Sequence, residues 1–411
     1  MKKTLCFILA FYSLHFSYSD QWIQKANFSG TPRNGSCIFS IGGKGYIGIG
    51  TDSYPVYNFK NDFWEYDPST DSWTQKASFP GTARYTPIYF SLGSKGYVGT
   101  GWNQVNPLFN DMWQYDQPTN TWAQKANFPG PQRQGGMGFT IGNKAYAGFG
   151  NNNTNTFKDF YVYNDTTDVW TPVAVFPGAS RFHAFYFALN GKGYIGAGSV
   201  GYPNYNFVND MWEYDPLADS WTQKANFPGL PRFQLGFFSI NNIGYAGMGE
   251  IVTNGVISNC YNDFYAYNPI TNTWTTKSSY PITAGAGIQG GFSIGQKGYT
   301  GCGYNLQTGN LNSFYEYVPD TTTGINDEEV SANDYYVYPN PCLDFINISC
   351  NKSVEKKNAR ILITDAAGKN MYTSNFMSQK IKVDVSDFAA GIYTVQLSNG
   401  KQMGSKQFVK R

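Results

Sequence analysis

Short stretches in which hydrophobic and polar residues alternate follow one another along most of the chain, separated by clusters of Gly, Asn, Asp, Ser and Pro. A representative stretch is 61–73, where the aromatic segment FWEYD leads into the polar turn PSTDS and then into a segment opened by Trp73. Alternation with a period of two, bounded by turn residues, predicts β-strands. Aromatic residues make up 18% of the chain, which also favours strands over helices. We therefore expect an all-β protein.

The 61–73 segment is part of a repeat. Related sequences occupy 110–122, 158–170, 209–221 and 262–274, and a shortened copy, NSFYEYVPD, begins at Asn312. The tryptophans of the repeat are residues 22, 73, 122, 170, 221 and 274, and a second strand recurs with Tyr at 46, 97, 146, 194, 245 and 299. A period near 50 residues with four strand signals per repeat is typical of a β-propeller blade, so we expect six blades.

The phase of the repeat predicts how the ring closes. The last repeat supplies three strands, near 288–294, 297–303 and 312–317, and lacks the strand that opens with Trp. The spare strand of this type lies around Trp22, at the other end of the repeat region. We expect residues 21–27 to complete the sixth blade, because closure removes exposed sheet edges.

The order of motifs resembles the kelch repeat: Pro-Arg, then Gly-Tyr-x-Gly-x-Gly, then an aromatic strand ending in Tyr-Asp-Pro, then Trp. The resemblance covers about residues 20–320 and implies a kelch β-propeller. The chain departs from the kelch pattern in two respects. The usual Gly-Gly doublet is Gly-x-Gly, as at Gly48 and Gly50, and the sixth repeat has no Arg near Thr283.

Both ends of the chain differ in pattern from the repeat region. Residues 1–19 combine two lysines, an apolar run and a small-x-small site, which predicts a secretory signal peptide. Residues 321–334 are polar and predict a linker, and 335–411 contain alternating strands that predict a small β-sandwich.

This tail resembles the C-terminal sorting domain of type IX secretion in Bacteroidetes-type bacteria. The resemblance rests on Tyr338-Pro339-Asn340-Pro341, Asp365-Ala366-Ala367-Gly368, Ala390-Gly391-Ile392-Tyr393 and Lys406-Gln407-Phe408-Val409-Lys410. It implies contact with the type IX machinery and a protein that is secreted or held at the outer-membrane surface. The alternative is an ordinary carbohydrate-binding or adhesive sandwich.

Composition excludes several classes of partner. Without the signal lysines the chain has 28 basic and 28 acidic residues, so its neutrality gives no electrostatic case for nucleic acid or an anionic membrane. No segment beyond the signal approaches about 20 apolar residues, so no transmembrane segment is expected. His183 is the only histidine after the signal, which argues against a zinc or copper site, and we expect no cofactor. Five cysteines remain, and Cys260–Cys302 and Cys342–Cys350 are two possible disulfides.

An arginine recurs just before the innermost strand of five repeats. The resemblance to kelch propellers implies that these arginines lie near the channel mouth, where such a ring could bind a carboxylate or an anionic glycan. Alternatively each arginine pairs with the equally regular acids Asp62, Asp111, Asp159, Asp210 and Asp263. The candidate ligand-binding arginines are Arg33, Arg84, Arg133, Arg181 and Arg232.

The loops between the second and third strands vary most, and all contain Asn. They are 51–60, 102–109, 151–157, 199–208, 250–261 and 304–311. Aromatic faces beside amides suit sugars, although these rings could equally serve only to pack the loops. The candidate aromatic contacts are Tyr54, Tyr57, Trp102, Phe157, Tyr202, Tyr205 and Tyr304.

Glu250 is the only acid of its loop, and with Arg232 and His183 nearby in repeat phase it could form an acid/base site. A group of kelch propellers resembling sialic-acid mutarotases uses acid and Arg residues at this mouth. We favour non-enzymatic binding of a glycan or a protein by the loop face of the propeller. The alternative is a sugar-processing enzyme, a mutarotase or lyase, with its site at the channel mouth. An enzyme would need perturbed acid and base residues converging there. A third reading is adhesion between cells through the edge of the propeller.

Overall fold

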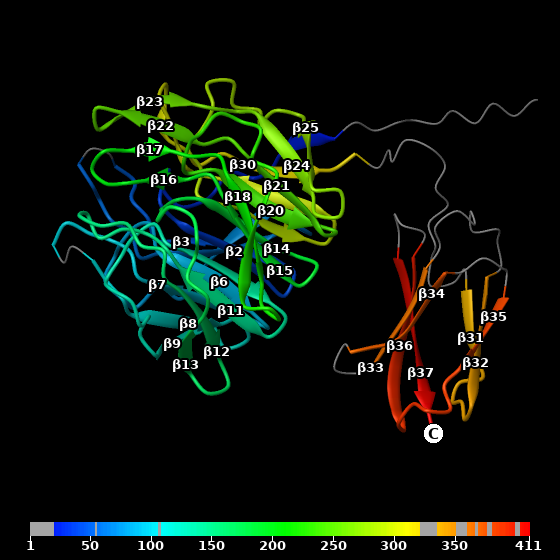
Figure 1. Cartoon of the computed structure of the whole chain (residues 1–411). Coiled ribbons are helices and arrows are strands. Elements are labelled where there is room, and N and C mark those ends of the chain that lie inside the picture. The colour runs from blue at the N-terminus through cyan, green and yellow to red at the C-terminus, as the bar shows by residue number, and fades with distance from the viewer. Residues whose placement is uncertain are drawn as a thin grey trace, which may run out of the picture. The chain divides into compact units, whose positions relative to one another are not determined.

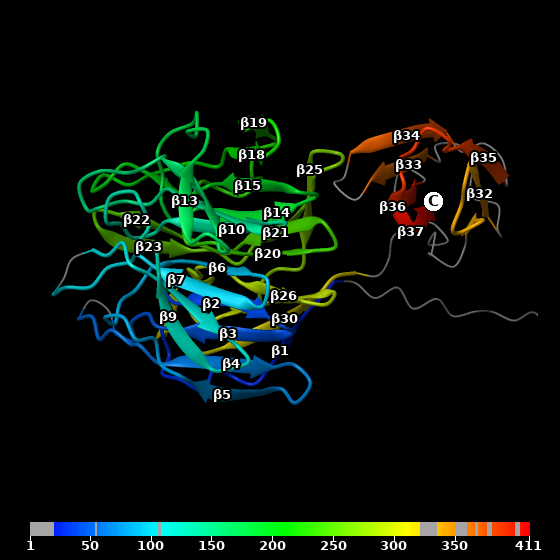
Figure 2. The same cartoon turned by 90° about the horizontal axis from the view of Figure 1, so that it is seen from below.

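Six four-stranded antiparallel sheets are arranged around a channel in the computed structural model of the chain (Figure 1, Figure 2). The structure describes residues 20–53, 56–105, 108–320, 335–350, 360–365, 369–375, 380–398 and 403–411. The segments 1–19 and 321–334, interpreted above as signal peptide and linker, lie outside the described residues. The regular elements of the described part are all strands. The expected all-β fold, a six-bladed propeller followed by a small sandwich, is confirmed.

In each blade the strands below follow one another from the channel outwards. The first two blades contain β2 (Cys37–Ile41), β3 (Lys44–Gly48), β4 (Phe63–Asp67) and β5 (Ser72–Lys76), then β6 (Ile88–Leu92), β7 (Lys95–Gly99), β8 (Met112–Asp116) and β9 (Thr121–Lys125). The next two contain β10 (Met137–Ile141), β11 (Lys144–Gly148), β12 (Phe160–Asn164) and β13 (Val169–Pro172), then β14 (Phe185–Leu189), β15 (Lys192–Gly196), β18 (Met211–Asp215) and β19 (Ser220–Lys224). The fifth contains β20 (Gly236–Ile240), β21 (Ile243–Gly247), β24 (Phe264–Asn268) and β25 (Thr273–Lys277), and the sixth contains β26 (Phe292–Ile294), β27 (Lys297–Gly301), β30 (Phe314–Val318) and β1 (Gln21–Gln24).

Burial falls from the channel to the rim, as the sequence pattern of each strand requires. The two inner strands of a blade are almost wholly buried, whereas the outermost strand buries little beyond its Trp face. The second strand carries glycine where the neighbouring blade inserts a ring. A Cβ on Gly96 would lie only 2.4 Å from the Phe39 ring of the preceding blade. Glycine there lets two sheets interlock at the channel.

The outermost Trp of each blade fastens that blade to the preceding one. The Trp170 indole donates a hydrogen bond of 3.2 Å to the Ala126 carbonyl. Asp168 accepts the Ala126 N–H at 3.0 Å and the Tyr163 hydroxyl at 2.6 Å. We call this Trp–Tyr–Asx group the blade latch. Its other indole bonds join Trp73 to Ala26, Trp122 to Ala77, Trp221 to Ala174, Trp274 to Ala225 and Trp22 to Ser278.

The sixth latch closes the ring, and β1 supplies it. Strand β1 pairs antiparallel with β30, with Trp22 opposite Tyr317. Asp20 takes the Asx position, because it accepts the Ser278 N–H at 2.6 Å and the Tyr317 hydroxyl at 2.9 Å. The prediction that the N-terminal strand completes the sixth blade is therefore confirmed.

The described residues from Tyr335 onwards belong to a second compact unit. One sheet contains β31 (Tyr335–Tyr338), β32 (Phe345–Cys350) and β35 (Lys380–Asp384). The other contains β34 (Asn370–Asn375), β33 (Arg360–Asp365), β36 (Gly391–Ser398) and β37 (Met403–Lys410). Both sheets contribute to one apolar core, including Ile348, Ile363 and Phe408, so the unit is a β-sandwich. A membrane-crossing helix is not found among the residues that the structure describes.

The cysteines do not pair as considered above. Cys260 and Cys302 are both buried free thiols, as are Cys37 and Cys342. Burial raises the pKa of the Cys302 thiol to about 12. The suggested Cys260–Cys302 and Cys342–Cys350 disulfides are therefore wrong.

Candidate functional site

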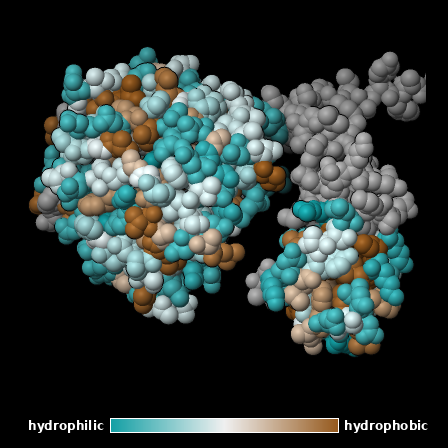
Figure 3. Space-filling view, viewed as in Figure 1, coloured by the Kyte–Doolittle hydropathy of each residue, from teal (hydrophilic) through white to brown (hydrophobic). Residues whose placement is uncertain are grey.

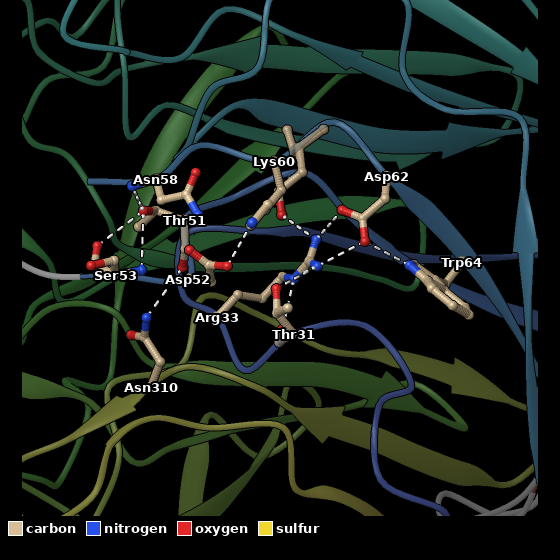
Figure 4. Close-up of polar contacts among 11 residues, drawn as sticks. Thr31, Arg33, Thr51, Asp52, Ser53, Asn58, Lys60, Asp62, Trp64 and Asn310 are labelled. Carbon is tan, nitrogen blue, oxygen red and sulfur yellow. Dashed lines mark hydrogen bonds and ion pairs between the residues drawn. The ribbon is translucent and has the colours of Figure 1, made fainter. Parts of the chain in front are cut away.

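The five recurring arginines are held inside the blades. Arg33 is 0% exposed, and its Nη1 and Nη2 donate to the two oxygens of Asp62 at 2.5 and 2.8 Å (Figure 4). Its Nη1 also donates to the Ile49 carbonyl, and the guanidinium lies 4.8 Å from the centre of the Phe28 ring. Although burial alone would raise the pKa of Asp62, the Arg33 bonds hold it below its ordinary value. The same two-pronged pairing joins Arg84 to Asp111, Arg133 to Asp159, Arg181 to Asp210 and Arg232 to Asp263.

The sixth blade lacks both members of this pair. Ala286 stands at the arginine position and Ser313 at the aspartate position. Their joint loss agrees with the geometry of the other blades, where neither charge is left without the other. The expectation that Arg33, Arg84, Arg133, Arg181 and Arg232 contact a ligand is therefore corrected: all five are 0% exposed and bound to carboxylates.

The residues next to these arginines surround the channel mouth instead. The residue after each arginine bridges to the residue after the Gly-x-Gly motif, as in Asn34–Thr51, Gln134–Asn151 and Phe233–Glu250. One position further on, the backbone of successive blades is joined by hydrogen bonds from His183 N–H to the Gly135 carbonyl and from Gln234 N–H to the His183 carbonyl. We call the two positions after each arginine, together with the matching positions of the sixth blade, the collar. The collar brings side chains from loops far apart in sequence to one opening.

A cavity of ≈ 100 Å³ lies at this opening. All six blades contribute residues to it. Tyr202 and Tyr205 come from the turn between β16 (Ser199–Val200) and β17 (Asn206–Phe207), and four lining residues come from the hairpin of β22 (Glu250–Thr253) and β23 (Val256–Cys260). Figure 1 labels both hairpins on the same side of the propeller. The lining of the cavity is aromatic and amide-rich, with one carboxyl and one imidazole. The lining residues are Asn34, Tyr57, Tyr85, Gln134, Asn151, Phe182, His183, Tyr202, Tyr205, Phe233, Gln234, Glu250, Val252, Gly255, Ile257 and Tyr304.

Glu250 is the only carboxyl group in this lining. It begins hairpin β22–β23, and its side chain is 2% exposed. Its Oε2 has no hydrogen-bond partner among the described residues and lies against Gly287, where a Cβ would come within 2.1 Å of it. Because burial disfavours the charged form, the pKa of Glu250 rises to about 8. Glu250 is thus a mostly neutral carboxylic acid at pH 7.

His183 belongs to the collar and is also uncharged. Its ring stacks on Phe233 with centroids 5.6 Å apart, and neither Nδ1 nor Nε2 has a partner among the described residues. Burial lowers the pKa of His183 to about 3. The structure therefore brings two of the three proposed acid/base residues into one cavity. Arg232 is not with them, because it is bound to Asp263 inside its blade.

The predicted aromatic contacts divide into two groups. Tyr57, Tyr202, Tyr205 and Tyr304 line the cavity. Trp102 lies outside that lining and packs against Tyr57, Phe59 and Tyr85.

The two remaining aromatic candidates lie elsewhere. Phe157 covers Arg133, whose guanidinium is 4.5 Å from the ring centre. Tyr54 is outside the described residues.

Sequence reasoning missed the amides of the collar region. Asn34, Gln134 and Gln234 line the cavity, although they lie beside the inner strands rather than in the variable loops. Their signal was the repeat phase, since the two positions after the arginine vary between blades, whereas the arginine itself is present in five of the six.

A second, larger cavity lies further along the channel, away from the Glu250 end, and offers fewer groups for chemistry. This cavity of ≈ 320 Å³ is lined by the inner strands, including Ser40, Thr140 and Ser293. These hydroxyls donate to backbone carbonyls of the adjacent blade. They join blades to one another, so we place the candidate site at the Glu250 end.

Comparison with known proteins agrees with both parts of the fold. Residues 336–411 match the family described as the secretion system C-terminal sorting domain. A solved structure titled "Structure of YjhT" resembles the chain with a TM-score of 0.61 at 14% identity, covering 72% of this chain and 98% of that one. Such a likeness shows the propeller fold alone. No curated protein matches the chain. The C-terminal sandwich is thus a sorting domain, which indicates secretion or attachment at the cell surface by the type IX route.

Proposed function

We propose that the protein is exported through its sorting domain and that its propeller binds a neutral glycan at the channel mouth. The observation that carries the proposal is the cavity around Glu250, where unpartnered polar atoms lie beside aromatic rings. A concave site with a few convergent polar groups is the usual form of a small-molecule site. The kelch-like repeat pattern supports assigning residues 20–320 to a kelch-type propeller, with residues 1–19 as signal peptide and 321–334 as linker.

The charge of the cavity favours an uncharged ligand. No Lys, Arg or Asp belongs to its lining, and the five arginines once considered for an anion are bound to aspartates. Burying an ionised carboxylate near a neutral acid and a neutral imidazole would carry a large desolvation cost without a compensating cation. We therefore expect neutral saccharides to bind in preference to sialylated or uronic ones.

The groups present match the chemistry of a sugar. Asn and Gln side chains both donate and accept hydrogen bonds, the protonated Glu250 donates, and His183 offers a donor and an acceptor. Tyrosine rings cover the apolar C–H faces of a pyranose while their hydroxyls bond its edges. A volume of ≈ 100 Å³ holds several waters and suits one sugar unit.

Catalysis on the same sugar is a second candidate, because the acid and base in the cavity have shifted pKa values. Glu250, with a pKa of about 8, can donate a proton at neutral pH, and unprotonated His183 can accept one. In enzymes, two titratable groups whose pKa values are moved in opposite directions by their surroundings are often the catalytic acid and base. Turnover of a bound saccharide would establish this candidate in place of pure binding.

A glycan array tests the proposal. Protein lacking residues 1–19 is screened against neutral and anionic glycans, and the bound glycans are recovered and checked for conversion. We expect neutral hits whose affinity falls at least tenfold in Tyr205→Ala and changes in Glu250→Gln, with Asn155→Ala, an exposed residue of the same loop face, as matched control. Binding restricted to anionic glycans, or hits insensitive to both cavity variants, would contradict the proposal.

Export is tested separately. Deleting residues 325–411 removes the sorting domain and should leave the propeller in the periplasm. Appearance of the truncated protein in the medium or on the cell surface would refute this part of the proposal, whatever the glycan array shows.

A further inference from the structure

Three cavities follow one another along the channel of the propeller. The cavity around Glu250, here called the Glu250 cavity, shares His183 and Gln234 with a cavity of ≈ 20 Å³. The cavity of ≈ 20 Å³ in turn shares aromatic residues, among them Tyr89 and Tyr186, with the cavity of ≈ 320 Å³. Because shared residues lie between the cavities that they line, two layers of side chains separate the Glu250 cavity from the largest one.

The second layer closes the channel. A Cβ placed on Gly290, in the sixth blade, would lie 2.2 Å from the Tyr89 hydroxyl oxygen. The same point is 3.1 Å from a methyl group of Ile38 and 3.4 Å from the Phe237 ring. Tyr89 and Phe237 belong to the second and fifth blades, so side chains from opposite sides of the channel meet at one point. Tyr186 packs against Phe237 with ring centres 4.3 Å apart. We call Ile38, Tyr89, Tyr186 and Phe237 the plug.

Hydrogen bonds hold the plug across the channel. The Tyr89 hydroxyl donates to the backbone carbonyl of Gln289, which leads into the sixth blade. The Tyr186 hydroxyl accepts the backbone N–H of Gly138, in the third blade. The four side chains of the plug are buried, and together with these two backbone partners they come from all six blades. The channel is therefore blocked below the Glu250 cavity by a packed and hydrogen-bonded layer.

Backbone hydrogen bonds close the ring of blades around the Glu250 cavity. In each blade the N–H of the second glycine in the Gly-x-Gly motif donates to the carbonyl of the arginine position in the next blade, at 2.7–2.9 Å. The six bonds run from Gly50 to Arg84, Gly101 to Arg133, Gly150 to Arg181, Gly198 to Arg232, Gly249 to Ala286 and Gly303 to Arg33. The last of them joins the sixth blade to the first, so the ring is complete. The Glu250 cavity is thus closed below and on its sides, and it opens between the variable loops.

The shape of a sugar site decides which part of a chain it can hold. An internal unit has a neighbour on each side, so it needs an open groove through which the chain enters and leaves. The Glu250 cavity is instead a cup, and its ≈ 100 Å³ suit one sugar unit. On the propeller face shown in Figure 3, hydrophobic residues form small patches separated by hydrophilic ones, and they do not join into a band that an extended chain could follow.

We propose that the Glu250 cavity binds the terminal unit of a neutral glycan chain and not the units within the chain. This inference rests on the proposed function of the cavity and names its class of ligand, which is chain ends. The terminal unit lies among the collar side chains beside Glu250 and His183, and the rest of the chain leaves through the mouth between the variable loops. The amount of protein that a polysaccharide binds is then set by its number of ends.

Calorimetric titration of the protein lacking residues 1–19 tests the inference. The probes are linear hexasaccharides of glucose, mannose, galactose and N-acetylglucosamine. Each is used free, blocked at the non-reducing end by a benzylidene acetal, blocked at the reducing end by reductive amination with an aromatic amine, and blocked at both ends. The internal units are the same in every form.

For a hexasaccharide that binds, we expect one of the two single blocks to lower the affinity at least tenfold, because a closed cup has no room for the added group. The other single block should leave the affinity unchanged and so shows which end is bound. The doubly blocked chain should bind as weakly as the weaker singly blocked one. The affinity per chain should also be the same for a trisaccharide as for the hexasaccharide, whereas a site for internal units gains with each added unit.

Tyr205→Ala shows whether the binding belongs to the Glu250 cavity, and Asn155→Ala, on the same loop face, is its matched control. Equal affinity for all forms of a chain, lost in Tyr205→Ala and kept in Asn155→Ala, would overturn the restriction to chain ends and leave the proposed glycan site intact. Binding that is insensitive to Tyr205→Ala, or no binding of any hexasaccharide, would overturn both this inference and the proposed function on which it rests.

Discussion

Removing the Trp22 side chain should open the propeller at the point where its two ends meet. Trp22 contacts the rings of Phe264 and Tyr317, each with centroids 4.9 Å apart, and that of Tyr280 at 5.2 Å. Its indole also donates to the Ser278 carbonyl at 2.9 Å. Replacing a large packed aromatic by Ala costs about 3–5 kcal/mol, and the lost hydrogen bond belongs within that range.

This free energy translates into a measurable shift of the melting temperature. Unfolding entropy near 2.1 cal/mol/K per residue gives about 0.6 kcal/mol/K for a propeller of roughly 300 residues. Trp22→Ala should therefore lower Tm by about 5–8 °C. All 10 tryptophans lie between positions 22 and 274, so tryptophan fluorescence follows the propeller without interference from the sorting domain.

Trp170→Ala is the matched control, because Trp170 occupies the same latch on β13, an outermost strand that follows the other strands of its own blade directly in the chain. Both variants should lose similar stability at the same scan rate. A Tm unchanged in Trp22→Ala but lowered in Trp170→Ala would refute the closure of the ring by β1. Deletion of residues 20–28 should lower Tm further still.

Four further predictions concern the interior of the propeller. In urea unfolding, Arg84→Ala should lower the free energy of unfolding by about 3–5 kcal/mol, because it leaves the Asp111 carboxylate without its cation. The double variant Arg84→Ala/Asp111→Ser has the residue types of the sixth blade and should cost less than the single change. The free energy of unfolding should fall by about 2 kcal/mol as pH rises from 6.5 to 8, because folded Glu250 keeps a proton that the unfolded chain has released. Glu250→Gln should remove this dependence on pH. The same pH dependence in Glu250→Gln would count against a buried neutral acid. Below pH 6.5 the unfolded chain protonates His183 while the folded protein does not, so this residue lowers stability as pH falls towards 3, and His183→Asn should abolish that loss. The buried thiols of the propeller should react with a thiol reagent only on unfolding, and dithiothreitol should leave Tm unchanged; a lowered Tm would reveal a disulfide.

The fold could be read from the sequence because a propeller repeats itself. Trp spacing fixed the number of blades, and the unmatched strand at Trp22 indicated the closure. Both features depend on local strand patterns and on counting, so neither required knowledge of contacts between distant residues.

The site could be predicted only in part. The placement of Glu250 and His183 in one cavity followed from repeat phase, but nothing local revealed that Gly287 makes room for the carboxyl. The pairing of the arginines with aspartates could have been inferred from the sequence, because the sixth blade replaces both members of the pair, with Ala286 and Ser313. Regular spacing placed the five arginines near the channel mouth, whereas their burial depended on side-chain packing within each blade.

The most direct test of the account is a crystal structure of the protein with the neutral saccharide that it binds most tightly. We predict one sugar unit in the cavity at the channel mouth, with the Glu250 carboxyl and at least one tyrosine hydroxyl within hydrogen-bond distance. The arginines should remain paired with their aspartates. A sugar bound at the blade edges, in the opposite end of the channel or on the sorting domain, with the Glu250 cavity empty, would contradict the account.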